Sequence, residues 1–184
     1  MFKRLLGIEP NPNQNVVDEL YEQIVAAARQ PVLYADWQVP DTPLGRFEMI
    51  SLMLLLVLRR LRGETGSADA ISQDLVDTFF KEVEHSIREL GIGDAGVPKR
   101  MKKLTRMFYG RTASYGAALD ENDEAALAEA LKRNVQPTEA AWPQAGHLAG
   151  YAAQIAQSLT SQPLDALTRG IIAFPDASRT GEAS

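Results

Sequence analysis

The sequence of 184 residues contains no cysteine and only two histidines, His85 and His147. The lack of cysteine excludes disulfides, thiolate metal sites and catalysis by a cysteine nucleophile. With two imidazoles in the whole chain, a histidine-rich metal site is excluded as well. The sequence also lacks a calcium-binding loop of the Asp-x-Asp-x-Asp-Gly type. We therefore expect neither a metal nor a cofactor.

Long apolar runs are also missing. The longest one extends from Met49 to Leu58 and ends at Arg59-Arg60, so it is shorter than the roughly 20 residues that a spanning helix needs. We expect it to be a buried core helix. The N-terminus carries cations but has no apolar stretch or cleavage site typical of a secretory signal. These features predict a cytoplasmic protein, and peripheral contact with the cytoplasmic face of the inner membrane stays open.

No run of alternating β-branched residues is long enough for a strand pair, and apolar residues recur at helical spacing instead. We predict an all-α fold, a single compact domain of six to seven helices over residues 15–174. A flexible segment (1–14) precedes this domain and a polar tail (175–184) follows it. The proline spacing of the connector 31–43 discourages both helix and central strand. Gly63 and Gly91 are expected to end the second and third helices. The expected helices cover about residues 15–30, 44–62, 68–90, 98–119, 120–134, 148–159 and 164–170.

Acidic residues are scarce in one place, although the net charge is −5. The stretch from Val97 to Arg111 holds six cations and no acid. Projected as a helix, it places its apolar residues on one side and four cations on the other. So polarised a charge pattern favours an anionic partner, whereas an ordinary solvated face is the alternative for any single lysine. The six cations are Lys99, Arg100, Lys102, Lys103, Arg106 and Arg111.

Arg111 differs from the other five, because the projection places it on the apolar side. A buried guanidinium needs an acidic partner, since burial of an isolated charge is costly. The candidate acids are Asp41, Glu48 and Asp94. We predict an internal ion pair that holds the connector against the basic helix.

Two blocks of sequence carry a family resemblance. The first reads PDTPLGRFE at residues 40–48 and leads into an apolar run ending at Leu61. The second reads RELGIGDAGVPKRMK at residues 88–102 and continues to FYGR at 108–111. Together they resemble the ubiquinol–cytochrome c chaperone family over roughly residues 30–120, and the chain looks like a bacterial-type member.

The resemblance implies a non-enzymatic factor for the assembly of respiratory complex III, which receives newly made cytochrome b. In some members this happens near the ribosomal exit, and mitochondrial members work with a small partner protein. In that role the cations of the basic helix would bind the client or a partner, together with Tyr109, Arg46 and Trp37. We expect Trp37 to be an accessible anchor because it lies in a loop. For Phe47, ordinary packing is the stronger interpretation.

Two other functions use the same cations. One is binding to RNA or the ribosome, although the acidity of the chain and the lack of a binding motif argue against a general nucleic-acid binder, and no DNA partner is expected. The other is peripheral membrane attachment through residues 2–6 together with the basic helix. An enzyme is the least expected class, because no nucleophile–base pair is indicated by spacing.

Overall fold

The computed structural model describes residues 13–179 of the chain. Within this range the chain forms helices and no strand, so the prediction of an all-α fold is confirmed. Residues 1–12 of the N-terminal segment expected over 1–14 lie outside the described range, and Gln14 already begins the first helix. The membrane-attachment segment expected at residues 2–6 also lies outside the described residues.

Six of the described helices are long and two are short. The glycines that were expected to end two of the long helices, Gly63 and Gly91, adopt left-handed backbone conformations with φ of 84° and 78°. The short helices are α2 (Pro31–Ala35) and α8 (Leu164–Leu167). The long ones are α1 (Gln14–Ala28), α3 (Pro43–Leu61), α4 (Ser67–Glu89), α5 (Val97–Asp120), α6 (Glu124–Val135) and α7 (Ala145–Ser161).

Helix α3 is the centre of the fold and contacts α1, α4, α5, α6 and α7. Its start is defined by Pro43 in the first turn and by Thr42, whose Oγ1 accepts a hydrogen bond from the main-chain N–H of Gly45 (3.1 Å). All residues from Leu52 to Val57 are buried, as expected for a core helix. No helix within residues 13–179 is long and apolar enough to cross a bilayer.

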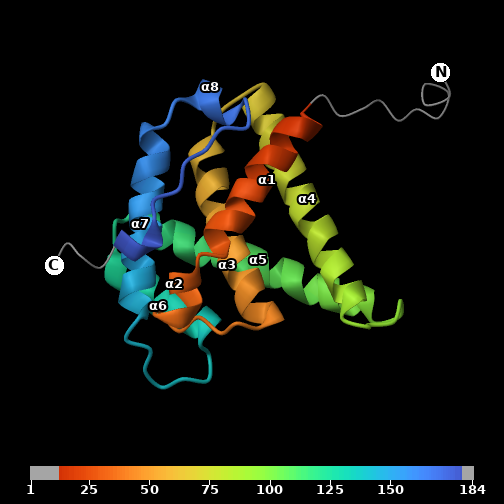
Figure 1. Ribbon diagram of the computed structural model, residues 1–184, viewed down its shortest axis with the longest axis vertical. Coiled ribbons are helices and arrows are strands. Elements are labelled where there is room, and N and C mark those ends of the chain that lie inside the picture. The colour runs from red at the N-terminus through yellow and green to blue at the C-terminus, as the bar shows by residue number, and fades with distance from the viewer. Residues whose placement is uncertain (1–12, 180–184) are drawn as a thin grey trace.

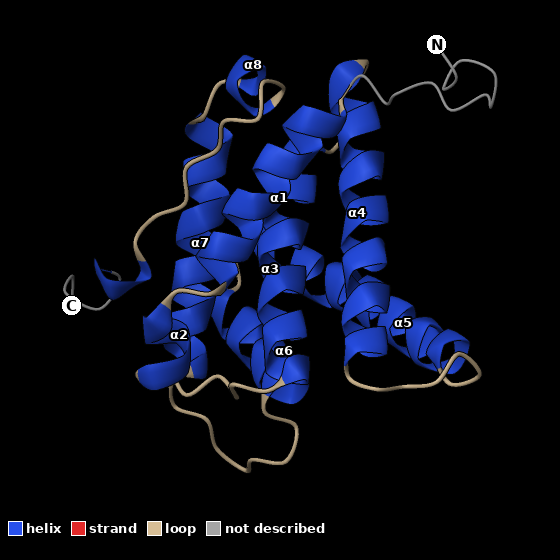
Figure 2. Ribbon diagram, turned by 45° about the vertical axis from the view of Figure 1, so that its right-hand side comes forward, coloured by secondary structure: helices blue, strands red, loops and turns tan. Residues whose placement is uncertain are grey.

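Helices α4 and α5 form a hairpin whose turn projects away from α7 (Figure 2). We call the region 80–110 the α4–α5 arm. The second half of α5 packs on α3 and α6, and Tyr115 and Leu119 are buried there. Between Val97 and Met107, by contrast, only Val97 is buried. The first half of α5 therefore leaves most of its surface exposed.

Residues 170–177 run beside α7 toward the end of α1, and between a turn at Gly170 and a short 3-10 helix that begins at Ala177 they have no regular secondary structure (Figure 1). We call them the C-terminal strap. The side-chain amide of Gln23 in α1 donates to the carbonyl of Gly170 (2.7 Å) and accepts from the N–H of Ile172 (3.2 Å). Gln162, just after α7, pairs with both main-chain groups of Ala173 (2.8 and 2.9 Å). Side-chain amides thus satisfy a main chain that has no secondary structure of its own.

The strap is held at its far end as well. The hydroxyl of Tyr151 in α7 donates to the main-chain carbonyl of Pro175 (2.8 Å), and the side-chain Oε1 of Gln30 accepts from the N–H of Ala177 (2.8 Å). Ala177 is buried. Residues 175–179, which the sequence assigns to the polar tail, therefore lie against the helical body.

The connector 31–43 was expected to contain no helix, and this prediction is wrong for its first part. Pro31 is the first residue of α2. Proline is tolerated at this position, because the first N–H groups of a helix have no partner within the helix. The proline therefore begins a short helix where the spacing of prolines seemed to prevent one.

Candidate binding surface

The basic stretch folds as one unbroken helix, α5, so its cations lie as the helical projection predicts. We call Lys99, Lys102, Lys103 and Arg106 the basic face. All four side chains are exposed, and Arg100 is exposed as well. None of these five cations forms an ion pair with any acid among the described residues. The basic face is therefore free to attract an anionic partner.

Several arginines outside the basic face are neutralised by neighbouring acids. Arg59 and Arg62, at the end of α3, both contact Asp120 at the end of α5, which lowers the pKa of that carboxyl. Arg88 bonds to Glu84 and to Asp94. The basic face differs from these sites because its four cations share one side of a single helix and none of them has an acidic partner in the described part of the chain.

Tyr109 lies in the same arm and is 55% exposed. Its ring contacts those of Phe108 (5.4 Å between centroids) and Phe80 (6.4 Å). Phe108 in turn packs on Phe79 (5.2 Å), which packs on Phe47 in α3 (5.7 Å). The series of rings runs from the core to the surface and ends at Tyr109. The exposed ring of Tyr109 is therefore held in place by packing against Phe108 and Phe80.

Phe80 was not identified from the sequence, although it supports Tyr109. The signal was the pair Phe79-Phe80, because consecutive residues of a helix point about 100° apart and both cannot face the same core. Phe47 is only 7% exposed, in agreement with ordinary packing.

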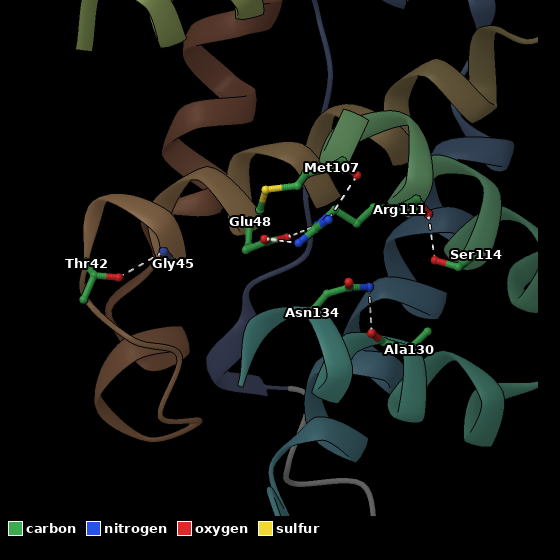
Figure 3. A network of polar contacts seen from close by, with 8 residues as sticks. All are labelled: Thr42, Gly45, Glu48, Met107, Arg111, Ser114, Ala130 and Asn134. Carbon is green, nitrogen blue, oxygen red and sulfur yellow. Dashed lines mark hydrogen bonds and ion pairs between the residues drawn. The ribbon is translucent and has the colours of Figure 1, made fainter. Parts of the chain in front are cut away.

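Arg111 is buried against Glu48 where α5 crosses α3 (Figure 3). Its Nε donates to Oε2 of Glu48 (2.6 Å), and its Nη2 donates to Oε1 (2.5 Å). Nη1 of the same side chain donates to the carbonyl of Met107 (3.1 Å). The side chain of Glu48 is only 1% exposed and that of Arg111 is 11% exposed. The guanidinium and the carboxylate therefore satisfy each other in a bidentate pair.

Burial opposes the charge that this pair needs. It raises the pKa of Glu48, whereas the hydrogen bonds and the positive charge of Arg111 lower it. Burial also raises the pKa of nearby Tyr115, and the Glu48 carboxylate raises it further. The buried carboxylate of Glu48 therefore stays charged only with Arg111 beside it. The pair is a specific contact that joins α3 to the base of the arm.

Two of the three candidate partners of Arg111 lie elsewhere. Asp41 pairs with Arg46 (2.7 Å), and both side chains are more than half exposed. Asp94 pairs with Arg88 at the turn of the arm. The sequence predicted that this ion pair would hold the connector. Because Glu48 belongs to α3, the pair instead joins α5 to the central helix. The partner of a buried charge is decided by which helices cross, and spacing along the chain does not contain that information.

Trp37 is 5% exposed, so the expectation of an accessible anchor is wrong. Its ring packs edge-on against Tyr151 of α7 (5.5 Å between centroids), and its carbonyl accepts a hydrogen bond from Nε1 of Trp142 (2.9 Å). Residues more than 100 positions further along the chain thus cover this loop tryptophan. Arg46 remains exposed, but it is paired with Asp41 and lies outside the basic face.

The surface of the arm can therefore bind by charge and by aromatic contact. Within residues 13–179, no three carboxylate or imidazole side chains are grouped in a way that could hold a metal ion. The basic face, Tyr109 and the ion pair that fixes the base of the arm all belong to α5 or to the helices that pack directly against it.

Comparison with known proteins agrees with this architecture. Residues 35–174 match the family described as ubiquinol–cytochrome c chaperone. The crystal structure of the Cbp3 homologue from Brucella abortus is similar to this structure with a TM-score of 0.86 and 51% sequence identity, over 97% of this chain and 99% of that one. No curated protein matches the chain in sequence. The family match spans most of the described residues and the similar structure is that of a bacterial member, so the chain belongs to the ubiquinol–cytochrome c chaperone family.

Proposed function

We propose that this protein is a non-enzymatic assembly chaperone for respiratory complex III and that it binds newly made cytochrome b. Membership of the ubiquinol–cytochrome c chaperone family supports the assembly role. The extent of the similarity to the Cbp3 homologue, 97% of this chain, supports carrying that role over to the whole protein. In this role the protein works at the cytoplasmic face of the inner membrane.

One observation on this chain carries the binding step. Helix α5 presents the four exposed cations of the basic face, none of them in an ion pair within residues 13–179, next to an exposed aromatic ring. Arg59, Arg62 and Arg88, which lie outside α5, are by contrast paired with acids. A partly folded membrane protein offers apolar segments and charged connecting loops, and a surface that combines an aromatic side chain with cations suits both. The basic face and Tyr109 are accordingly the proposed contact with the client.

The test is a crosslinking pull-down of cytochrome b from native membranes dissolved in detergent. Wild type is compared with a basic-face variant, in which the four cations are changed to glutamine. A control variant has the same net charge but carries its changes on other elements, at Arg29, Lys81, Arg133 and Arg169. All eight side chains belong to the polar surface, and circular dichroism checks that each variant is folded.

We expect wild type and control to capture cytochrome b, and the basic-face variant to capture about tenfold less, as for the loss of a few charge-assisted contacts. Tyr109→Ala should weaken capture without changing its dependence on salt, because it removes apolar contact alone. Equal capture by the basic-face variant would place the client elsewhere on the molecule. Absence of cytochrome b from every eluate would overturn the proposed function.

A further inference from the structure

The basic face is straight and convex, because it belongs to a single helix with no neighbour on that side. At a rise of about 1.5 Å per residue, Lys99 and Arg106 lie about 10 Å apart along the axis. Helical spacing continues this face through Gly110, Ala113 and Ala117, all of them exposed and small. No large side chain therefore lifts the helix away from a flat surface placed against it.

Charge on this face has one sign over its whole length. The helix has no acid from Val97 to Leu119, and its first acid is Asp120, which is already engaged by Arg59 and Arg62. Acids on other elements are screened beyond a Debye length of about 8–10 Å at physiological salt. A planar anionic surface that touches only this face therefore meets cations, although the net charge of the chain is −5.

We propose that the basic face adsorbs to the anionic headgroups of a phospholipid bilayer, with Tyr109 at the interface. This inference rests on the proposed function, since the bilayer is the one that holds the client. Single-stranded RNA is the less suitable phosphate polymer, because it is bound in grooves that carry several stacking rings, and this face has the shape of a ridge with one exposed ring. Tyrosine is also one of the two residues enriched at the level of the headgroups.

The strength of such adsorption follows from the number of cations. Each lysine or arginine at an anionic surface contributes about 1 kcal/mol, which is roughly a fivefold gain in partition. Four cations together increase the partition onto an anionic surface by roughly a few hundredfold. This amount suffices for reversible attachment, and it depends on salt because the interaction is screened.

The test uses the full-length protein and vesicles of phosphatidylcholine, either alone or mixed with phosphatidylglycerol. Flotation should recover wild type with the anionic vesicles and not with the neutral ones. The basic-face variant should lose roughly 100-fold or more in partition. The control variant changed at Arg29, Lys81, Arg133 and Arg169 should float like wild type. Raising the ionic strength should release wild type and the control variant from the anionic vesicles.

A second measurement identifies the face in contact. Trp37 and Trp142 are each 5% exposed, so their fluorescence reports little of the surface. In a Tyr109→Trp variant, anionic vesicles should shift the emission of the new tryptophan to shorter wavelength. Binding without this shift would mean that another surface is in contact, which overturns the proposal.

The other outcomes are equally decisive. If wild type fails to float with anionic vesicles, or if the control variant loses as much as the basic-face variant, the inference is wrong. Strong binding to a homopolymer RNA without binding to vesicles would make RNA the partner of this face and would also overturn it. These vesicles contain no client, and the capture of cytochrome b is measured in detergent, so a failure of either proposal is distinguishable from a failure of the other.

Discussion

Arg111 and Glu48 lie 63 residues apart in the chain, yet their side chains meet through two hydrogen bonds of 2.5 and 2.6 Å. The pair is buried where α5 crosses α3, directly beneath the arm. Its geometry connects the core of the protein to the position of the basic face. Changes at this pair should therefore affect both stability and binding.

Arg111→Met should destabilise the protein by about 3–5 kcal/mol, because it leaves the buried carboxylate of Glu48 without a partner. Removing both charges together, with Arg111→Met and Glu48→Leu, should recover most of this loss. Denaturant unfolding measures both variants against wild type. A double variant as unstable as the single one would mean that the cavity, and not the unpaired charge, causes the loss.

The loss of stability in the Arg111→Met variant should depend on pH in a defined direction. Burial raises the pKa of Glu48 above its usual value of 4.5, and without Arg111 nothing on that side chain opposes this rise. A folded-state pKa above the unfolded one gives stability that is present below pH 4.5 and lost as the pH rises through the folded-state value. The difference in stability between wild type and Arg111→Met should therefore be smallest in acid and grow toward neutral pH.

Two glycines should respond in opposite directions to replacement by alanine. A Cβ at Gly45 would lie 1.9 Å from the carbonyl oxygen of Pro40, so Gly45→Ala must displace the main chain at the start of α3. We expect a loss of about 2 kcal/mol or more. A Cβ at Gly110 meets no atom within 4 Å, and Gly110→Ala should stabilise the helix by about 1 kcal/mol. Thermal unfolding measures both, and a destabilised Gly110→Ala would contradict the packing described for α5.

Alkaline unfolding should report on the C-terminal strap. The pKa of Tyr151 is raised to about 12, because the effect of burial exceeds the lowering by the hydrogen bond from Gln30. Because the folded-state pKa lies above the usual value of 10, stability is complete below pH 10 and falls as the pH rises toward 12. Tyr21, whose pKa is also about 12, contributes in the same window. Tyr151→Phe should lose about 1 kcal/mol at neutral pH and show a weaker decrease above pH 10.

The amides of Gln23 and Gln162 should control local opening of the strap. Gln23→Ala removes the acceptor of the Ile172 N–H, and Gln162→Ala removes that of the Ala173 N–H. Each loss of about 1.4 kcal/mol should speed hydrogen exchange at the corresponding amide about tenfold. Gln157→Ala, an exposed change on α7, is the matched control and should leave both exchange rates unchanged.

The helices could be predicted because their signals are local. The period of apolar residues locates α1, α3, α4 and α5 to within about two residues, and Gly63 and Gly91 end two of them as expected. The short α2 was missed because proline discourages a helix in general and yet suits its first turn.

The binding surface was predicted in part for the same reason. Which cations share a face of α5 depends only on helical spacing, whereas the partner of Arg111 and the burial of Trp37 depend on distant elements. The loop position of Trp37 suggested exposure, but Trp142 and Tyr151 cover it. Likewise, nothing near Gln23 or Gln162 in the sequence indicates that their amides bind the strap.

The strap has a consequence for the order in which the protein can be completed during synthesis. Gln23 and Gly170 are 147 positions apart, so the hydrogen bond between them cannot form until Gly170 has left the ribosome. At about 5–20 residues per second, α1 waits about 7–30 s for this contact. Until then α1 has its packing on α3 and α4 but lacks the strap, so the attachment of this early helix is completed by a segment made much later.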